Sequence, residues 1–168
     1  MAQKAFLLLG SNLGNRSRQL SSARNFLGEQ AGKIAASSRI YQTQPWGITQ
    51  QPLFLNQAVL LNTTLEPLLL LEKILAIEEQ MGRHRAEKWG ERIIDIDILF
   101  YEDRVIHHEK LTIPHPQFQF RNFAMAPMVE LAPAWKHPVL GKTVSQLLQE
   151  SSDPLRAEVW RSSQKKGS

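Results

Sequence analysis

The run Arg92-Ile-Ile-Asp-Ile-Asp-Ile-Leu-Phe-Tyr101 constrains the fold of this chain more than any other segment. Side chains alternate between the two faces of a β-strand, so residues two apart share a face. The alternation therefore predicts a strand over about residues 93–101, with Asp95 and Asp97 on one face. The other face is expected to enter a core through its apolar residues, Ile94, Ile96, Ile98 and Phe100.

The two aspartates can be explained in two ways. A strand with one solvent-exposed face is the commoner explanation of alternating aspartates. Alternatively, a divalent cation neutralises them, because two carboxylates at the same depth repel each other and are costly to bury alone. Oxygen ligands in a chain without cysteine favour Mg²⁺ over zinc for such a site.

The segment before this strand favours the second explanation. Residues 82–92 carry more basic than acidic side chains, with Arg83, Arg85, Lys88 and Arg92 against Glu87 and Glu91. Guanidinium groups bind phosphate oxygens in a bidentate geometry, and metal ions neutralise the remaining oxygens. A basic loop that leads directly into paired aspartates therefore suits a substrate with several phosphates, since phosphoryl transfer needs mainly positioning and charge stabilisation.

The composition fits one globular domain over residues 1–160, followed by a flexible tail over residues 161–168. A net charge of +4 suits anionic ligands, including nucleotides and nucleic acid. The absence of cysteine excludes disulfides, thiolate zinc sites and cysteine nucleophiles. The first apolar stretch is too short for a secretory signal and the run at 68–71 is too short to span a bilayer, so we expect a cytoplasmic protein.

Hydrophobic periodicity predicts the main elements of the fold. We expect strands over about 5–9, 34–41, 54–62 and 93–101, and helices over about 16–30 and 67–81. They are followed by a short strand near Val105, an extended segment over 111–116, and short helices near 122–130 and 144–149. This order predicts an α+β, ferredoxin-like split βαβ sandwich, in which helices pack on one face of an antiparallel sheet. The fold supports many functions, so it does not identify one.

Three residues in these elements are candidates for a binding site. Phe54 and Asn56 share a strand face, and they form either a platform and an amide for a flat heterocycle or a core ring and a satisfied edge amide. Glu78 continues the apolar stripe of the second predicted helix. It either contacts a ligand or a loop arginine, or already lies in solvent.

Further candidates lie in the predicted loops. His115 stands between two prolines that restrict its backbone, which suits a rigidly held imidazole that binds phosphate or carries a proton. Arg121 and Phe123 flank the start of a short helix and could supply a charge and a ring. Trp46 and Trp89 lie in loops, where a tryptophan forms a lid or a stacking surface, or simply covers the core.

Taken together, these segments resemble the 6-hydroxymethyl-7,8-dihydropterin pyrophosphokinase family of folate biosynthesis. The matching pieces are Leu9-Gly-Ser-Asn-Leu-Gly14, Tyr41-Gln-Thr-Gln-Pro-Trp-Gly47, Phe54-Leu-Asn-Gln-Ala58, Gly82-Arg-His-Arg85, Lys88-Trp-Gly-Glu-Arg-Ile-Ile-Asp-Ile-Asp-Ile98, and Leu111-Thr-Ile-Pro-His115 with Arg121 and Phe123. They run in order from residue 9 to about 130, and the stretch from Arg83 to Asp97, followed by the piece Thr112-Ile-Pro-His115, is specific.

The resemblance implies an enzyme that transfers an intact diphosphate from ATP, its co-substrate, to the hydroxymethyl group of the pterin and releases AMP. By the same resemblance, Asp95 and Asp97 would bind two Mg²⁺ ions, and two metals can clamp the attacking and leaving oxygens of such a displacement. Arg83 and Arg92 match loop arginines that assist transfer, and residues 84–91 would act as a lid that excludes water.

The resemblance also assigns the substrate-binding residues. The pterin-binding positions are Thr43, Gln44, Trp46, Phe54, Asn56 and Phe123. The ATP-binding positions are Glu78, Arg85, Trp89, Ile98, Lys110, Thr112, His115 and Arg121. Four positions depart from the family pattern: Gln44 replaces a proline, Leu75 a glutamine, Lys110 an arginine and Pro116 an aromatic residue. The expected partners are these two small molecules, bound by a monomer that uses neither nucleic acid nor a membrane.

Two other functions are compatible with the sequence. A non-catalytic nucleic-acid-binding module can share this topology and expose basic and aromatic residues on its sheet. Asp95 and Asp97 oppose that hypothesis, because they would repel a phosphate backbone in the absence of metal. Another enzyme of pterin metabolism, such as an aldolase, would leave the arginines beside the aspartates unexplained.

Overall fold

A computed structural model describes residues 1–43, 52–82 and 93–162 of the chain. The strands are β1 (Gln3–Ser11), β2 (Lys33–Ser37), β3 (Tyr41–Thr43), β4 (Phe54–Thr63), β5 (Asp95–Tyr101), β6 (Ile106–His108), β7 (Leu111–Ile113) and β8 (Glu158–Val159). The helices are α1 (Arg16–Gln30), α2 (Pro67–Gln80), α3 (Asn122–Leu131) and α4 (Val144–Gln149), with a short 3₁₀ helix, η1 (Phe118–Phe120).

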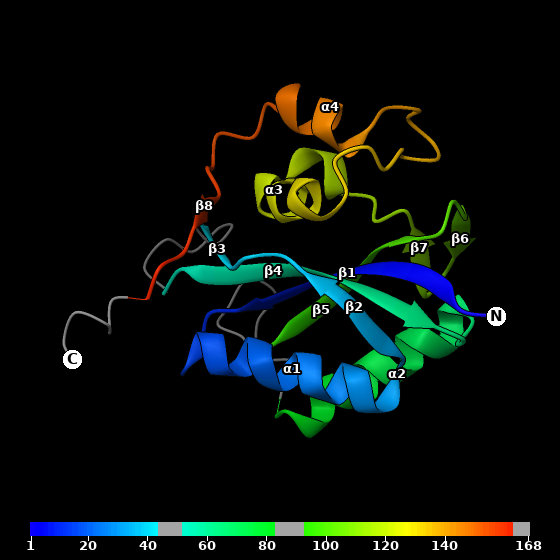
Figure 1. The fold of residues 1–168 in the computed structure, drawn as a ribbon, viewed down its shortest axis with the longest axis vertical. Coiled ribbons are helices and arrows are strands. Elements are labelled where there is room, and N and C mark those ends of the chain that lie inside the picture. Colours follow the sequence, from blue (N-terminus) through cyan, green and yellow to red (C-terminus); the bar gives the residue numbers. More distant parts are fainter. Residues whose placement is uncertain (44–51, 83–92, 163–168) are drawn as a thin grey trace.

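The main sheet has the strand order β5-β1-β4-β3-β8, and β2 pairs with the far half of β4. All of these pairings are antiparallel, as the ferredoxin-like α+β class predicts. Helices α1 and α2 cover one face of the sheet, and α3 and α4 form a layer on the other face (Figure 1). The sequence predicted helices on one face only, so the second layer is an addition to that arrangement.

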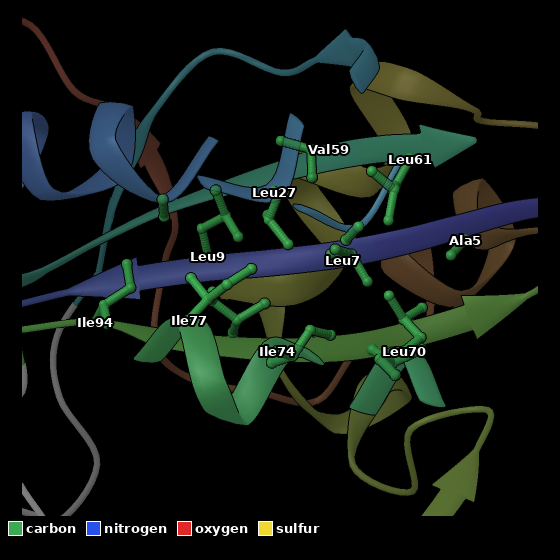
Figure 2. Packing of buried hydrophobic residues seen from close by; sticks show 14 of the residues in the cluster. Ala5, Leu7, Leu9, Leu27, Val59, Leu61, Leu70, Ile74, Ile77 and Ile94 are labelled. Atoms are coloured by element: carbon green, nitrogen blue, oxygen red, sulfur yellow. The ribbon is translucent and has the colours of Figure 1, made fainter. Parts of the chain in front are cut away.

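The two helical layers enclose two apolar cores. The first core lies between the sheet and the α1–α2 layer, where Leu7 and Leu9 of β1 meet Leu27, Ile74 and Ile77 from the helices (Figure 2). The second core lies under α3 and α4 and contains Phe6, Leu8, Phe100, Phe118, Met125 and Met128. Since successive residues of β1 enter opposite cores, this strand reads as a continuous buried run in the sequence.

An irregularity in the β1–β5 pairing changes the predicted alternation of β5. Phe6 pairs with Phe100, whereas the next residue, Leu7, pairs with Ile98. Because Leu99 is the extra residue between these pairs, the alternation is interrupted there. Ile94, Ile96 and Ile98 belong to the first core as a group, but Phe100 belongs to the second core. The expected common face of these four residues is therefore wrong at Phe100.

The strand predicted over residues 34–41 is divided into β2 and β3 at Ser38. The Ser38 hydroxyl accepts a hydrogen bond from the Ala58 amide (3.0 Å) and donates one to the Arg39 carbonyl (2.7 Å). Gln57 adds a third bond by donating its Nε2 to the Ser38 carbonyl (2.6 Å). These side-chain bonds replace part of the regular pairing, so β2 and β3 each pair with a different half of β4.

The two long helices begin as their sequences predict. The Asn15 side chain caps α1 by accepting a hydrogen bond from the Arg18 amide (3.2 Å), and Pro67 occupies the first turn of α2. Each helix packs one apolar stripe against the first core. Within the ranges that the structure describes, neither these helices nor the others could cross a membrane, given their length and polarity.

Candidate active site

Asp95 and Asp97 lie on β5 at the end of the sheet where β1 also ends, and both side chains are half-buried. Asp97 pairs in register with Leu8, and Asp95 pairs with Gly10. Leu8 packs in the second core, so the two carboxylates lie on that face of the sheet, beyond the edge of the apolar layer. The predicted common face of the aspartates is therefore confirmed.

Gly10 separates this acidic pair from the predicted pterin-binding residues. It pairs with Asp95 on one side and with Asn56 on the other. A methyl group at Gly10 would lie 2.7 Å from Oδ1 of Asn56 and 3.7 Å from Cδ1 of Phe54. The glycine therefore leaves the space that the Asn56 carboxamide occupies, and it keeps the sheet surface open between β5 and β4.

Thr43, Phe54 and Asn56 form one connected group on β3 and β4. Thr43 pairs with Phe54, and the Asn56 Nδ2 donates a buried hydrogen bond to the Thr43 hydroxyl (2.9 Å). Thr43 and Asn56 are almost fully buried, whereas Phe54 is only partly covered. Because Thr43 fixes the carboxamide, Asn56 presents a defined hydrogen-bonding edge beside an accessible ring, as the heterocycle hypothesis requires.

Arg121 and Phe123 bring a charge and a ring to the same end of the sheet. The Arg121 guanidinium carbon lies 5.5 Å from the centre of the Phe123 ring, within cation–π range. Burial lowers the pKa of Arg121, while the nearby carboxylates of Asp97 and Asp153 act in the opposite direction. Arg121 is thus a partly buried cation that lies close to Asp97, which is an arrangement suited to a polyanionic ligand.

His115 is held beside β5 as a neutral imidazole. Its amide donates to the Leu99 carbonyl (3.0 Å), and its Nδ1 accepts from the Gln117 amide (3.1 Å). Burial, and to a lesser degree Arg121, lowers the pKa of His115 to about 4. A neutral ring whose Nδ1 accepts carries its proton on Nε2, so His115 suits donation to a phosphate better than proton transfer at neutral pH.

Glu78 is buried, so the alternative that it lies in solvent is wrong. Its Oε2 accepts a hydrogen bond from the Ile96 amide (2.7 Å), which joins the last turn of α2 to β5 one residue from each aspartate. Leu75, by contrast, is 44% exposed, so it does not continue the buried stripe of this helix. Glu78 thus has a structural partner on the strand that carries the aspartates.

The remaining described ATP-site candidates lie on β5 and on the β6–β7 hairpin. Ile98 packs its side chain into the first core, so only its backbone can face a ligand. Lys110 and Thr112 belong to the β6–β7 hairpin, where Lys110 is exposed and Thr112 is half-buried. The candidates Gln44, Trp46, Arg83, Arg85, Trp89 and Arg92, and the lid over 84–91, lie outside the described residues.

The donor set fits a hard cation such as Mg²⁺. Asp95 and Asp97 supply carboxylate oxygens on one strand face, and a metal that takes substrate phosphates and water needs only one or two protein carboxylates. In the segments that the structure describes, no cluster of three acidic or histidine side chains forms a larger cage. The two aspartates are therefore the residues that would hold the ion.

Sequence reasoning missed two residues that bear on this site, Gly10 as a spacer and Asp153 as a neighbour of Arg121. Gly10 belongs to a segment that matches the family pattern, but the residues that lie beside it depend on the strand register, which the sequence does not show. Asp153 is far from Arg121 in sequence, and no local pattern connects them. The complete arrangement defines an α+β, ferredoxin-like protein with an acidic pair, a cation and an aromatic–amide surface at one end of its sheet.

Comparison with known proteins identifies the family. The family model of 7,8-dihydro-6-hydroxymethylpterin-pyrophosphokinase (HPPK) matches residues 6–133. The chain is 42% identical over 143 residues to the 2-amino-4-hydroxy-6-hydroxymethyldihydropteridine pyrophosphokinase of Synechocystis sp., an alignment that covers 84% of this chain and 73% of that protein. A protein of the same name from Aquifex aeolicus is 38% identical over 88% of this chain and 91% of its own length. The chain therefore belongs to the HPPK family, whose members are pyrophosphokinases of folate biosynthesis.

Solved structures agree on the fold. The crystal structure of wild-type HPPK-DHPS from Plasmodium falciparum matches with a TM-score of 0.75 at 21% sequence identity. The match covers 89% of this chain but only 45% of that longer chain. At this identity the comparison establishes a shared fold, which is the ferredoxin-like α+β arrangement described above.

Proposed function

We propose that this chain transfers the intact diphosphate of ATP to the hydroxymethyl group of 6-hydroxymethyl-7,8-dihydropterin and releases AMP. The observation that carries the proposal is the register at Gly10, with Asp95 on one side and Asn56 on the other. This arrangement would place a metal-binding pair on β5 and a heterocycle-binding edge on β4, the two strands that flank β1. The family to which the chain belongs supplies the reaction class.

The pterin would bind over Phe54 and against the Asn56 carboxamide, whose orientation Thr43 fixes by a hydrogen bond. Phe123 would stack on the ring from the α3 side, and Gln44 and Trp46 would complete the pocket. This position would direct the hydroxymethyl group past Gly10 toward Asp95. Aromatic stacking supplies affinity, while an orientated amide supplies the selectivity for one heterocycle edge.

Asp95 and Asp97 would hold two Mg²⁺ ions, which supply charge neutralisation for the triphosphate when bound. Arg121, close to Asp97, would bind phosphate oxygens, and the Nε2 proton of His115 would donate to another. Glu78, Ile98, Lys110 and Thr112 would line the nucleotide side with Arg85 and Trp89. In the displacement, the pterin hydroxyl oxygen bonds to the β-phosphorus, the bond from that phosphorus to the α,β-bridging oxygen breaks, AMP leaves with that oxygen, and the hydroxyl proton passes to solvent.

Arg83, Arg92 and the loop over residues 84–91 would exclude water, which would otherwise accept the diphosphate. We assign the whole reaction to one domain over residues 1–160; most of the tail predicted over 161–168 lies outside the described residues. The proposed enzyme acts as a monomer in the cytoplasm, and it binds small molecules rather than nucleic acid or a membrane. These assignments rest on the sequence.

Nucleotide product analysis tests the proposal. The purified chain is mixed with ATP, Mg²⁺ and the hydroxymethyl dihydropterin, and the nucleotides are separated by ion-exchange chromatography. We expect AMP to accumulate in equal amount to the pterin diphosphate, with no AMP when the pterin is omitted or EDTA is added. ADP as the sole product would contradict diphosphate transfer, and metal-independent RNA binding without AMP formation would favour the nucleic-acid-binding alternative.

A further inference from the structure

The segment over residues 151–160, which we name the C-terminal strap, returns from α4 to the sheet (Figure 1) and forms hydrogen bonds with Asn122, the first residue of α3. Its end forms β8, which pairs with Tyr41 and Gln42 of β3. The Trp160 amide then donates to the Ile40 carbonyl (2.8 Å). The strap therefore connects the start of α3, which carries Phe123, to β3, which carries Thr43.

The strap is fixed at α3 by the side chain of Asn122. Asn122 Nδ2 donates to the carbonyls of Leu155 (2.9 Å) and Asp153 (3.3 Å). Its Oδ1 accepts from the Ser151 hydroxyl (2.7 Å). The half-buried Asn122 side chain thus uses both its donor and its acceptor groups on the strap. Its hydrogen bonds are therefore specific to this segment.

The Asp153 side chain, on the strap, accepts a further hydrogen bond from α3. Its Oδ2 accepts from the Asn122 amide (2.8 Å), and its Oδ1 accepts from the Leu155 amide (2.9 Å). Arg121 supplies no side-chain cap to α3, so the Asp153 carboxylate provides the partner that the first amide of this helix requires. Asn122 stands between Arg121 and Phe123, so these bonds hold the residue between two predicted substrate contacts.

We propose that Asn122 and Asp153 are positioning residues for the diphosphate transfer, acting through Arg121 and Phe123. Asn122 and Asp153 lie outside the sets of residues assigned above to the metal, the pterin and ATP. They fix the backbone between Arg121, which lies close to Asp97, and Phe123, whose ring contacts the Arg121 guanidinium. This inference rests on the proposed function, because it assumes that Arg121 binds ATP and Phe123 binds the pterin.

Steady-state kinetics of AMP formation by the full-length chain test this inference. Asn122→Ala and Asp153→Ala should raise the KM for ATP and the KM for the pterin about tenfold each, equivalent to about 1.4 kcal/mol. The kcat should change by less than about threefold, because loss of uniform binding raises KM alone. Asp153→Asn can still accept one of the two backbone hydrogen bonds, so it should restore both KM values to within about threefold of wild type.

Ser152→Ala is the matched control, since Ser152 is exposed on the same segment between two anchored residues. Its KM values should stay within about twofold of wild type, because exposed substitutions away from such contacts have small effects. Circular dichroism and the thermal midpoint establish that each variant is folded. If Asn122→Ala does not fold, Ser151→Ala takes its place, because it removes only the two bonds of the Ser151 hydroxyl.

Unchanged KM values in folded Asn122→Ala and Asp153→Ala, or a lower kcat with both KM values unchanged, would overturn the positioning role. The second result would mean that only the fraction of active protein had fallen. Failure of the wild-type chain to form AMP would instead overturn the proposed function. The two failures are therefore distinguishable in one set of assays.

Discussion

Asp95 and Asn56 lie on opposite sides of one residue, Gly10, with which both pair in register. Neighbouring strands are about 4.8 Å apart, so β5 and β4 are about 10 Å apart at this level. The relationship therefore links the proposed metal end of the site to the proposed pterin end through a residue without a side chain.

Gly10→Ala should weaken pterin binding. The new methyl group would lie 2.7 Å from Oδ1 of Asn56, so the carboxamide must move away from its bond to Thr43. We expect the KM for the pterin to rise about tenfold, with an overpacking cost of about 1–3 kcal/mol in the free energy of unfolding. Kinetics with the pterin as the varied substrate, together with urea unfolding, measure both effects.

Gly28→Ala is the control for this substitution. Gly28 lies within α1, and no atom comes within 4 Å of an added methyl group. Alanine is the better helix former, so the variant should gain about 0.5–1 kcal/mol in stability and keep wild-type kinetics. An equal rise in pterin KM for both variants would mean that the contact with Asn56 is not the cause.

Asp97→Asn should remove most of the turnover without unfolding the protein. The amide keeps the size of the side chain but loses the charge that would hold Mg²⁺ and that faces Arg121. We expect kcat to fall at least about a hundredfold, the usual cost of losing an electrostatic contact to the transition state. The measurement is AMP formation at saturating Mg²⁺, with circular dichroism as the folding control. Full turnover in a folded variant would refute the metal assignment.

Tyr41→Phe should destabilise the contact between β3 and α3. The Tyr41 hydroxyl donates to Oε1 of Glu130 (2.7 Å), and Arg39 donates to the same carboxylate from its amide and its Nε. Burial raises the pKa of Glu130, but these bonds outweigh it and leave the pKa below its usual value. Loss of the hydroxyl should cost about 1.5–3 kcal/mol in urea unfolding, as expected for a hydrogen bond to a charged group.

Arg39→Ala tests the same cluster from its exposed side. The Arg39 side chain is 61% exposed, so its ion pair with Glu130 should contribute less than the Tyr41 bond. The Arg39 amide keeps its bond to Glu130 in this variant. A larger loss of stability for Arg39→Ala than for Tyr41→Phe would contradict this ranking.

Acid should destabilise the protein through His115. The pKa of His115 is about 4 in the folded chain, below the ordinary value of 6.5, so the unfolded chain binds more protons between these pH values. The free energy of unfolding should therefore fall as the pH is lowered from about 6.5 to 4, by up to about 3 kcal/mol from this group. His115→Gln should lose this part of the pH dependence in denaturant titrations.

His107→Gln is the matched control for the pH experiment, since His107 is exposed on β6. It should follow the wild-type curve. If His115→Gln and wild type lost stability in parallel over this pH range, protonation of His115 would not be the cause of the acid destabilisation.

The sequence predicted most of the fold because its signals are local. The bounds of α1 and α4 follow from capping residues and apolar spacing, and β1, β4 and α2 were predicted to within about two residues. The strand division at Ser38 and the irregularity near Leu99 were missed, because both depend on bonds with a neighbouring strand. The two-residue strand β8 likewise exists only through its pairing with β3.

The candidate site was predictable where its residues share one strand, as Asp95 with Asp97 and Phe54 with Asn56 do. The role of Gly10 was not, since it depends on which residues the adjacent strands bring beside it. The bonds between Asn122 and Asp153 join positions 31 residues apart, and no spacing rule connects them. Long-range contacts of this kind follow from topology rather than from local pattern.

The most direct test of the account is a crystal structure of the chain with Mg²⁺, α,β-methylene ATP and the hydroxymethyl dihydropterin. We predict electron density for metal bound by carboxylate oxygens of both Asp95 and Asp97, between the triphosphate and a pterin that contacts Asn56. Nucleotide and pterin bound in full while both carboxylates lie away from any cation would contradict it.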